Sequence, residues 1–165
     1  MQNECSECSA ALETNQAQCA YCGKARENFD EQLLIELIAV KRKYELAYSR
    51  GNKLIAAPLL ADEYTYILSD GGVVEEPRGK DAILSYAGLD KNFNSYNIYN
   101  EELLEKTANR AVISCVQSTV RLTPYDGEFT SYISRTKLTF VYREGRWQIA
   151  AEDCISIDEY GEVIL

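Results

Sequence analysis

Four cysteines near the start of the chain have the spacing of a metal site. They form the pattern Cys5-x2-Cys8-x10-Cys19-x2-Cys22. A short gap lets both sulfurs of a pair turn toward one point, and two such pairs supply the four thiolates of a tetrahedral zinc site. Four protein ligands leave no position for water, so such a metal is structural and does not perform hydrolysis. We therefore expect a structural Zn²⁺ bound by Cys5, Cys8, Cys19 and Cys22.

A pair of disulfides is the alternative use of these cysteines, and it is typical of small secreted domains. Two observations favour zinc in a reducing compartment. The residues after Met1 contain neither a basic region nor an apolar one, so we expect no secretory signal and a cytoplasmic location. Two further cysteines, Cys115 and Cys154, stand alone far downstream.

The segment over roughly residues 3 to 26 resembles the short zinc ribbons at the N-termini of many bacterial proteins. Gly23 directly follows the fourth cysteine, where such a knuckle needs close backbone approach. The segment departs from the resemblance at Ser9, where these ribbons usually have a second glycine. We expect residues 1–26 to form a zinc ribbon that contacts a protein partner or only stabilises the chain. A ribbon this short needs its metal to fold.

The composition excludes several classes of function. The chain has 17 Lys and Arg against 26 Asp and Glu, a formal charge of -9, and acids also outnumber bases in residues 1–30, which disfavours nucleic-acid binding. It has no histidine, which removes the usual neutral-pH acid or base. The longest apolar run, Leu33 to Val40, contains Glu36 and is far too short to span a bilayer. Any catalyst must use carboxylates, Tyr, Lys or Cys.

The elements that would position a site divide into helices followed by strands. Apolar residues with helical spacing predict a long helix that ends at Gly51: Leu33, Leu37, Val40, Tyr44 and Ala47. Two shorter helices are expected, one after Asn52 with Pro58 inside it and one over 81–89. Alternation with period two predicts strands over 64–68, 73–74, 96–104, 111–122, 129–142 and 147–156. We expect an α+β domain over 29–165, with the early helices on one face of a curved antiparallel sheet.

Four short segments carry a resemblance to a known superfamily: Tyr44–Asn52, Ala61–Thr65, Arg78–Ile83 and Gly145–Ile149. They resemble the end of the first helix, the entry to the first strand, the start of the third helix and the final hairpin of the nuclear transport factor 2-like superfamily. This superfamily includes ketosteroid isomerase and the SnoaL-like cyclases. The resemblance spans roughly residues 29 to 160 and implies a cone-shaped fold, with homodimers common among relatives.

The resemblance also allows a test for catalytic residues. A site like that of ketosteroid isomerase would have a tyrosine on the first helix, an Asp base on the first strand and a second acid. Tyr44 occupies the first of these positions, but Leu68 occupies the second and Lys137 the third. Hydratase members of the superfamily rely on histidine, which this chain lacks. Where relatives often have histidine on the final strand, this chain has Ala151 and Asp153. We therefore expect no catalytic residues.

The last predicted strand suggests which groups face the inside of the cone. With regular alternation, Trp147 and Asp153 share a face that points inward. Asp153 would then be a carboxylate in an apolar pocket; the alternative is that it pairs with Arg135, Lys137 or a tyrosine near the rim. The pocket is expected to bind a small, partly apolar molecule and to be lined by Tyr44, Tyr64, Tyr66, Trp147 and Asp153.

Two functions follow from these patterns. The first is a non-catalytic module that binds a small ligand or dimerises through its open sheet face, with a protein partner at the zinc ribbon. The alternative is an isomerase-like or cyclase-like enzyme that uses Asp153 with Tyr44. Cys115 and Cys154 lie on predicted central strands with no base beside them, so we expect inert thiols.

Overall fold

The computed structural model has the predicted α+β architecture. It describes residues 4–5, 7–11, 16–25, 28–70, 72–89, 93–122 and 129–157. The elements are α1 (Phe29–Ser49), α2 (Lys53–Ala56), the short 3₁₀ helix η1 (Ala57–Leu59), β1 (Leu60–Asp70), β2 (Val73–Val74), β3 (Arg78–Gly79), α3 (Lys80–Ser85), β4 (Phe93–Lys106), β5 (Arg110–Leu122), β6 (Phe129–Arg143) and β7 (Arg146–Ile157). No helix among the described residues has the length and apolar character needed to cross a membrane.

The strands form one curved sheet in the order β2-β1-β7-β6-β5-β4, with β3 paired to β1. Strands β4 to β7 are a run of antiparallel neighbours, whereas β1 runs parallel to β7. At the β6–β7 turn, Glu144 and Gly145 have φ of 53° and 76°, as a tight hairpin between long strands requires. The predicted turn at 125–127 lies outside the described residues.

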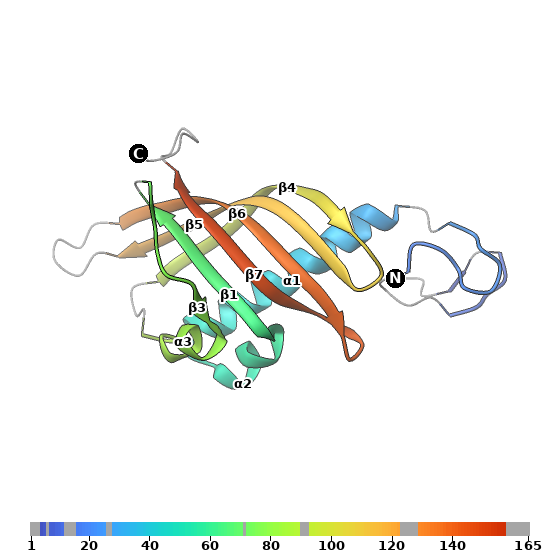
Figure 1. The fold of residues 1–165 in the computed structure, drawn as a ribbon, viewed down its shortest axis with the longest axis horizontal. Helices are drawn as coiled ribbons and strands as arrows, with labels where there is room; N and C mark the ends of the chain where they lie inside the picture. The colour runs from blue at the N-terminus through green and yellow to red at the C-terminus, as the bar shows by residue number, and fades with distance from the viewer. Residues whose placement is uncertain are drawn as a thin grey trace.

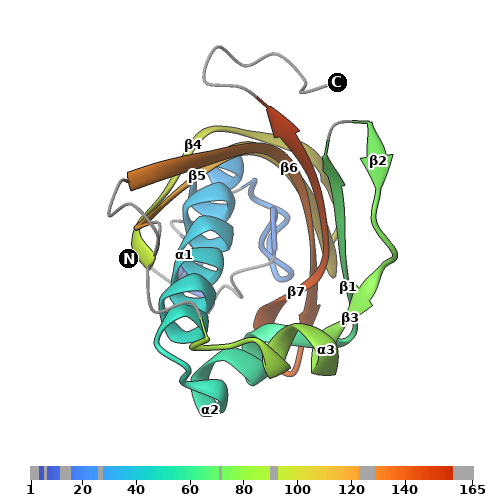
Figure 2. The same ribbon diagram turned by 90° about the vertical axis from the view of Figure 1, so that its left-hand side faces the viewer.

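Helix α1 crosses the concave face of this sheet, which curls around it (Figures 1 and 2). Its buried stripe has the predicted helical spacing and includes Leu33, Leu37 and Tyr44. The stripe also includes Lys41, which is only 1% exposed. The apolar residues of this stripe pack against the inner face of the sheet in a single core cluster.

The helices after α1 differ in length from the prediction. Helix α2 ends at Ala56, and Pro58 lies in η1 instead of inside the helix. The reason is that proline lacks the N–H that a continuing α-helix needs. Helix α3 ends at Ser85, and Gly88 in the turn that follows donates its backbone N–H to the Tyr48 carbonyl at 2.9 Å.

Strand β7 contains a bulge that decides which of its side chains face inward. Thr139 of β6 pairs with Ala151, but the next residue, Phe140, pairs with Ile149, so Ala150 is an extra residue in β7. Consequently Ile149 and Ala150 are both buried, and alternation then continues one residue out of phase. The inward side chains beyond the bulge are Glu152 and Cys154, and Asp153 points to the other face.

Candidate functional site

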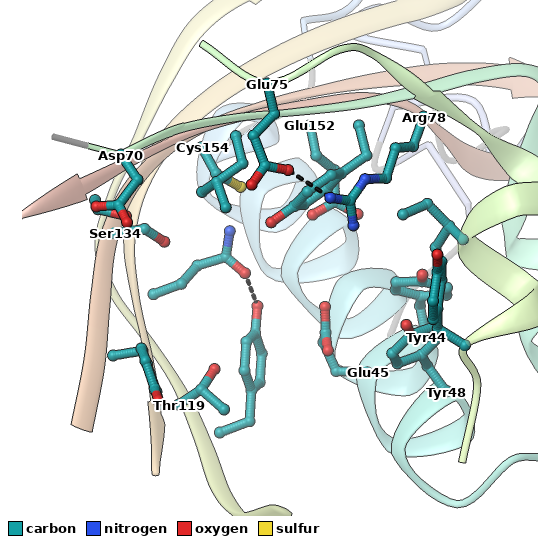
Figure 3. Close-up of a pocket in the computed structure, with 18 of the residues that line it drawn as sticks. Tyr44, Glu45, Tyr48, Asp70, Glu75, Arg78, Thr119, Ser134, Glu152 and Cys154 are labelled. Atoms are coloured by element: carbon teal, nitrogen blue, oxygen red, sulfur yellow. Dashed lines mark hydrogen bonds and ion pairs between the residues drawn. The ribbon is translucent and has the colours of Figure 1, made fainter. Parts of the chain in front are cut away.

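A cavity of about 500 Å³ lies between the second half of α1 and the inner face of the sheet. Figure 3 shows its walls, with groups from α1 on one side and from the strands on the other. Seven of the lining residues are tyrosines: Tyr44, Tyr48, Tyr64, Tyr66, Tyr86, Tyr96 and Tyr132. Their rings and hydroxyls make the wall both apolar and able to form hydrogen bonds. A hollow of this size fits a small organic molecule.

A buried ionic network forms one wall of the cavity. Glu152, only 2% exposed, accepts a hydrogen bond from the Tyr64 hydroxyl at 2.9 Å on Oε1 and binds the Lys41 ammonium through Oε2. Lys41 also contacts Oε1 of Glu45 at 2.6 Å, one turn further along α1. Both oxygens of Glu152 are therefore engaged by groups of the protein itself.

The electrostatics of the network fix the protonation of its members. Burial alone would lower the pKa of Lys41, but the carboxylates of Glu152 and Glu45 outweigh burial and hold the pKa of Lys41 well above its usual value. Burial, then the charge of Glu152, raises the pKa of both Tyr44 and Tyr64. The wall of the cavity thus has a charged lysine behind it and neutral tyrosine hydroxyls at neutral pH.

A second hydrogen bond lies in the cavity wall between two neighbouring strands. The Tyr96 hydroxyl of β4 donates to the side-chain carbonyl of Gln117 on β5. At the rim, the Arg78 guanidinium contacts Glu75 at 2.5 Å and lies 6.0 Å from the centre of the Tyr86 ring. The wall therefore offers several polar groups at fixed positions among the rings.

Three of the five pocket residues expected from the sequence line this cavity, namely Tyr44, Tyr64 and Tyr66. Trp147 is 2% exposed and lies in the core, where its ring packs at 5.2 Å against Tyr142. The inward position expected for Asp153 is wrong, because the bulge at Ala150 turns its side chain to the outer face. There it pairs with Lys137 at 3.4 Å, which was the alternative considered from the sequence.

The sequence reasoning missed three residues of the ionic network, Lys41, Glu45 and Glu152. Lys41 follows Leu37 by four residues and precedes Tyr44 by three, so a lysine on the apolar stripe was a visible signal. Glu152 gave no such signal. Its neighbour Asp153 is also an acid, so one of the two acids faces inward in either register of β7.

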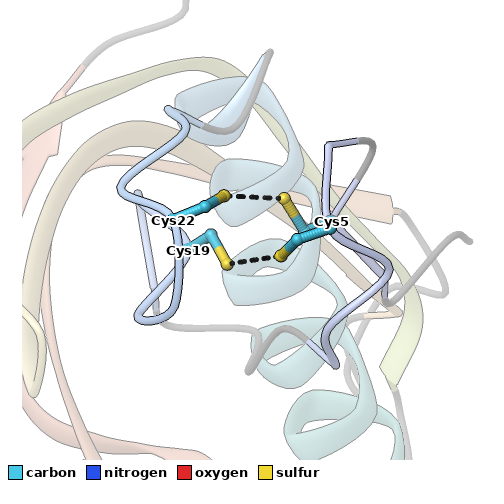
Figure 4. Close-up of side chains that lie close together, drawn as sticks. Cys5, Cys19 and Cys22 are labelled. Atoms are coloured by element: carbon cyan, nitrogen blue, oxygen red, sulfur yellow. Dashed lines mark hydrogen bonds between the residues drawn. The ribbon is translucent and has the colours of Figure 1, made fainter.

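The four N-terminal cysteines lie together, and Figure 4 labels Cys5, Cys19 and Cys22 of this cluster. Their sulfurs all lie within 4.8 Å of one another. The Sγ atoms of Cys5 and Cys22 are 3.5 Å apart, and those of Cys8 and Cys19 are 3.6 Å apart. A tetrahedral site with metal–sulfur bonds of about 2.3 Å places sulfurs about 3.8 Å from one another. The cluster has the geometry of a four-thiolate metal site.

The two halves of the cluster have the same local backbone. Ser9 donates its N–H to the Cys5 carbonyl at 2.8 Å, and Gly23 does the same to Cys19 at 2.9 Å. Both residues have positive φ, 55° for Ser9 and 73° for Gly23. This conformation suits glycine and strains serine. The knuckle at Ser9 nevertheless has the same geometry as the knuckle at Gly23.

Comparisons with solved structures show that the chain has the nuclear transport factor 2-like fold. A ketosteroid isomerase-like protein from Erwinia carotovora atroseptica is 17% identical, with a TM-score of 0.57 over 76% of this chain and 96% of that one. An NTF2-like protein from Cytophaga hutchinsonii is 16% identical, with a TM-score of 0.59 over 73% and 95%. The association domain of C. elegans CaMKII is 16% identical, with a TM-score of 0.62 over 78% and 98%. No protein-family model matches the sequence, and no curated protein matches it.

Proposed function

We propose that this protein is a non-catalytic module that binds a small organic molecule in the cavity between α1 and the sheet and carries a structural zinc ribbon. One observation supports binding over catalysis. Glu152, the deeply buried carboxylate of the cavity wall, already has both oxygens engaged by Lys41 and Tyr64. A general base must be free to accept a proton from the substrate, and an ion pair with a lysine weakens a carboxylate in that role.

The acid on which the enzymatic alternative depends does not lie in the cavity. An isomerase or cyclase that uses Asp153 with Tyr44 would need both groups in one cavity, and Asp153 lies on the outer face beside Lys137. The similarity to a ketosteroid isomerase-like protein concerns the fold, and this fold supports many unrelated activities.

Fragment screening by two-dimensional NMR tests the binding proposal. We expect fragments with an aromatic or apolar body to shift the resonances of cavity residues and to be recovered unchanged. Ser134→Phe should fill the cavity, since Ser134 lines it, and abolish these shifts. The matched control is Leu54→Phe, because Leu54 is 90% exposed on α2 and does not line the cavity. Conversion of a bound fragment to product, or the absence of any cavity binder, would refute the proposal.

We propose zinc as the metal of the cysteine cluster, because closed four-thiolate sites with two-residue gaps select Zn²⁺. The metal would hold the two knuckles together and take no part in cavity chemistry. The start of α1 at Phe29 and the cavity residue Tyr44 are about 22 Å apart along the helix, given a rise of 1.5 Å per residue.

Elemental analysis of protein purified without chelators tests this assignment. We expect one zinc per chain, lost in Cys22→Ser and retained in Cys115→Ala, because Cys115 is buried on β5 away from the cluster. The zinc assignment would be contradicted if protein purified without a reducing agent contained no metal and had its cluster cysteines joined by disulfides.

A further inference from the structure

We propose that the cavity selects an organic cation, an amine joined to an aromatic or apolar body. This inference rests on the proposed ligand-binding function and adds the chemical class of the ligand. Three features of the cavity carry it: an excess of carboxylates, aromatic rings that already hold cations, and a tyrosine hydroxyl in its wall.

The cavity wall has more negative than positive charge. Four carboxylates line it, those of Glu45, Asp70, Glu75 and Glu152, and Figure 3 shows them on different sides of the same space. Among the lining residues that the structure describes, Arg78 is the one basic residue, and Lys41 adds a second cation behind the wall. The formal excess is two negative charges, which favours a cationic ligand and disfavours an anionic one.

The protein's own cations show that rings and carboxylates of this wall hold positive charge. The Lys41 ammonium lies 5.1 Å from the centre of the Tyr44 ring and 6.0 Å from that of Tyr96, between Glu152 and Glu45. At the rim, Arg78 lies between Glu75 and the Tyr86 ring. These distances are those of cation–π contacts. A ligand ammonium would meet the same combination beside Glu45 and Tyr48.

Tyr44 supplies a specific partner for such a ligand. It lines the cavity and is only 3% exposed. A hydroxyl in the cavity wall can accept a hydrogen bond from a ligand N–H. An ammonium that donates to this oxygen would also lie next to the Glu45 carboxylate.

Three probes of similar shape test the inference by calorimetry at low ionic strength: 2-phenylethylamine, the neutral 2-phenylethanol and the anionic 3-phenylpropanoate. We expect the amine to bind at least about tenfold more tightly than the alcohol, and the anion to bind most weakly. Glu45→Gln should remove most of the preference for the amine over the alcohol. Asp70→Asn is a second variant that keeps Lys41 fully paired, and it should reduce the preference in the same direction.

The matched control is Asp153→Asn, which removes one carboxylate from the outer face of β7 and should leave all three affinities unchanged. Equal affinities for amine and alcohol, or a preference for the anion, overturn the cationic class while the small-molecule proposal stands. Failure of the amine to bind at about 10 mM also overturns the inference. The fragment screen separates that result from failure of ligand binding itself.

Discussion

Glu152 and Asp153 are neighbours in the sequence but lie in opposite environments. The Glu152 side chain is 3% exposed and engages Lys41, which is 1% exposed, whereas the side chains of Asp153 and Lys137 are 40% and 55% exposed. An exposed ion pair contributes little to stability, because water and salt screen it. A buried pair is different, since removal of one partner leaves a charge without compensation in a low dielectric.

Substitution of each acid should therefore give unequal losses of stability. We expect Glu152→Gln to lower the free energy of unfolding by about 2–3 kcal/mol, less than a lone buried charge costs because Lys41 keeps Glu45. Asp153→Asn should cost no more than about 1 kcal/mol. Urea denaturation at neutral pH measures both. Equal losses, or a larger loss for Asp153→Asn, would mean that β7 lacks the bulge at Ala150.

The two isolated thiols should be unreactive in the folded protein. Burial raises the pKa of Cys115 and of Cys154 to about 12 from the model peptide value of 9.0. At pH 8 only about one thiol in ten thousand is then a thiolate, so iodoacetamide should leave both unmodified, as mass spectrometry can determine. Rapid alkylation of Cys154 in folded protein would contradict this expectation.

The same shift makes stability depend on pH. A thiol whose pKa is raised by folding stabilises the folded state fully below the unfolded value, and this contribution falls as pH rises from 9.0 toward about 12. We expect the free energy of unfolding to fall over this window by about 1.4 kcal/mol per pH unit for each thiol. The variant Cys154→Ala should show a shallower decline, and an unchanged slope would contradict the assignment.

At the scale of elements, the sequence was sufficient where periodicity was long and regular. The stripe from Leu33 to Ala47 predicted α1, and the four long strands were placed within three residues of their observed ends. The bulge could not be predicted. At Ile149-Ala150-Ala151, β7 takes two residue steps where its partner β6 takes one. Alanine fits either face of a sheet, so neither register is penalised there. The error for Asp153 follows directly from this.

The end of α1 depends on close contact between two glycines, which connects it to the turn after α3. A Cβ added to Gly88 would lie 2.6 Å from the Cα of Gly51, and Gly88 has φ of 74°. We expect Gly88→Ala to lower the free energy of unfolding by roughly 2–4 kcal/mol, through both backbone strain and steric overlap. Thermal or urea denaturation measures the loss.

Gly72 provides the matched control for this substitution. Its φ is 77°, but a Cβ there would meet no atom within 4 Å. Gly72→Ala should therefore cost about 1–2 kcal/mol, the strain of the left-handed conformation alone. If both substitutions cost the same, the contact between Gly51 and Gly88 contributes nothing.

For the whole molecule, the outer face of the sheet is the surface on which we expect a homodimer. One row of paired residues crosses it, Tyr99, Val116, Arg135 and Ile155, and Tyr99 and Ile155 are 39% and 40% exposed. Sedimentation should give twice the 18.6 kDa chain mass, and Ile155→Glu should give the monomer. The control is Leu54→Glu on α2, where Leu54 is 90% exposed, and it should leave the dimer intact. Monomers in the unsubstituted protein would refute the expected homodimer.

Metal removal should separate the molecule into two parts with different requirements for folding. The core cluster of the cone contains no cysteine of the metal cluster, and it begins at Phe29. The first turn of α1 is fixed to β4 by the ion pair of Asp30 with Lys106, whose ammonium lies 5.4 Å from the Phe29 ring. A ribbon of this length cannot bury enough apolar surface to fold without its metal. Treatment with a chelator should therefore disorder residues 4–25 in hydrogen exchange, while the melting temperature of the cone and ligand binding in the cavity stay unchanged. Loss of exchange protection in β5 and β6 on chelation would instead show that ribbon and cone fold as one unit.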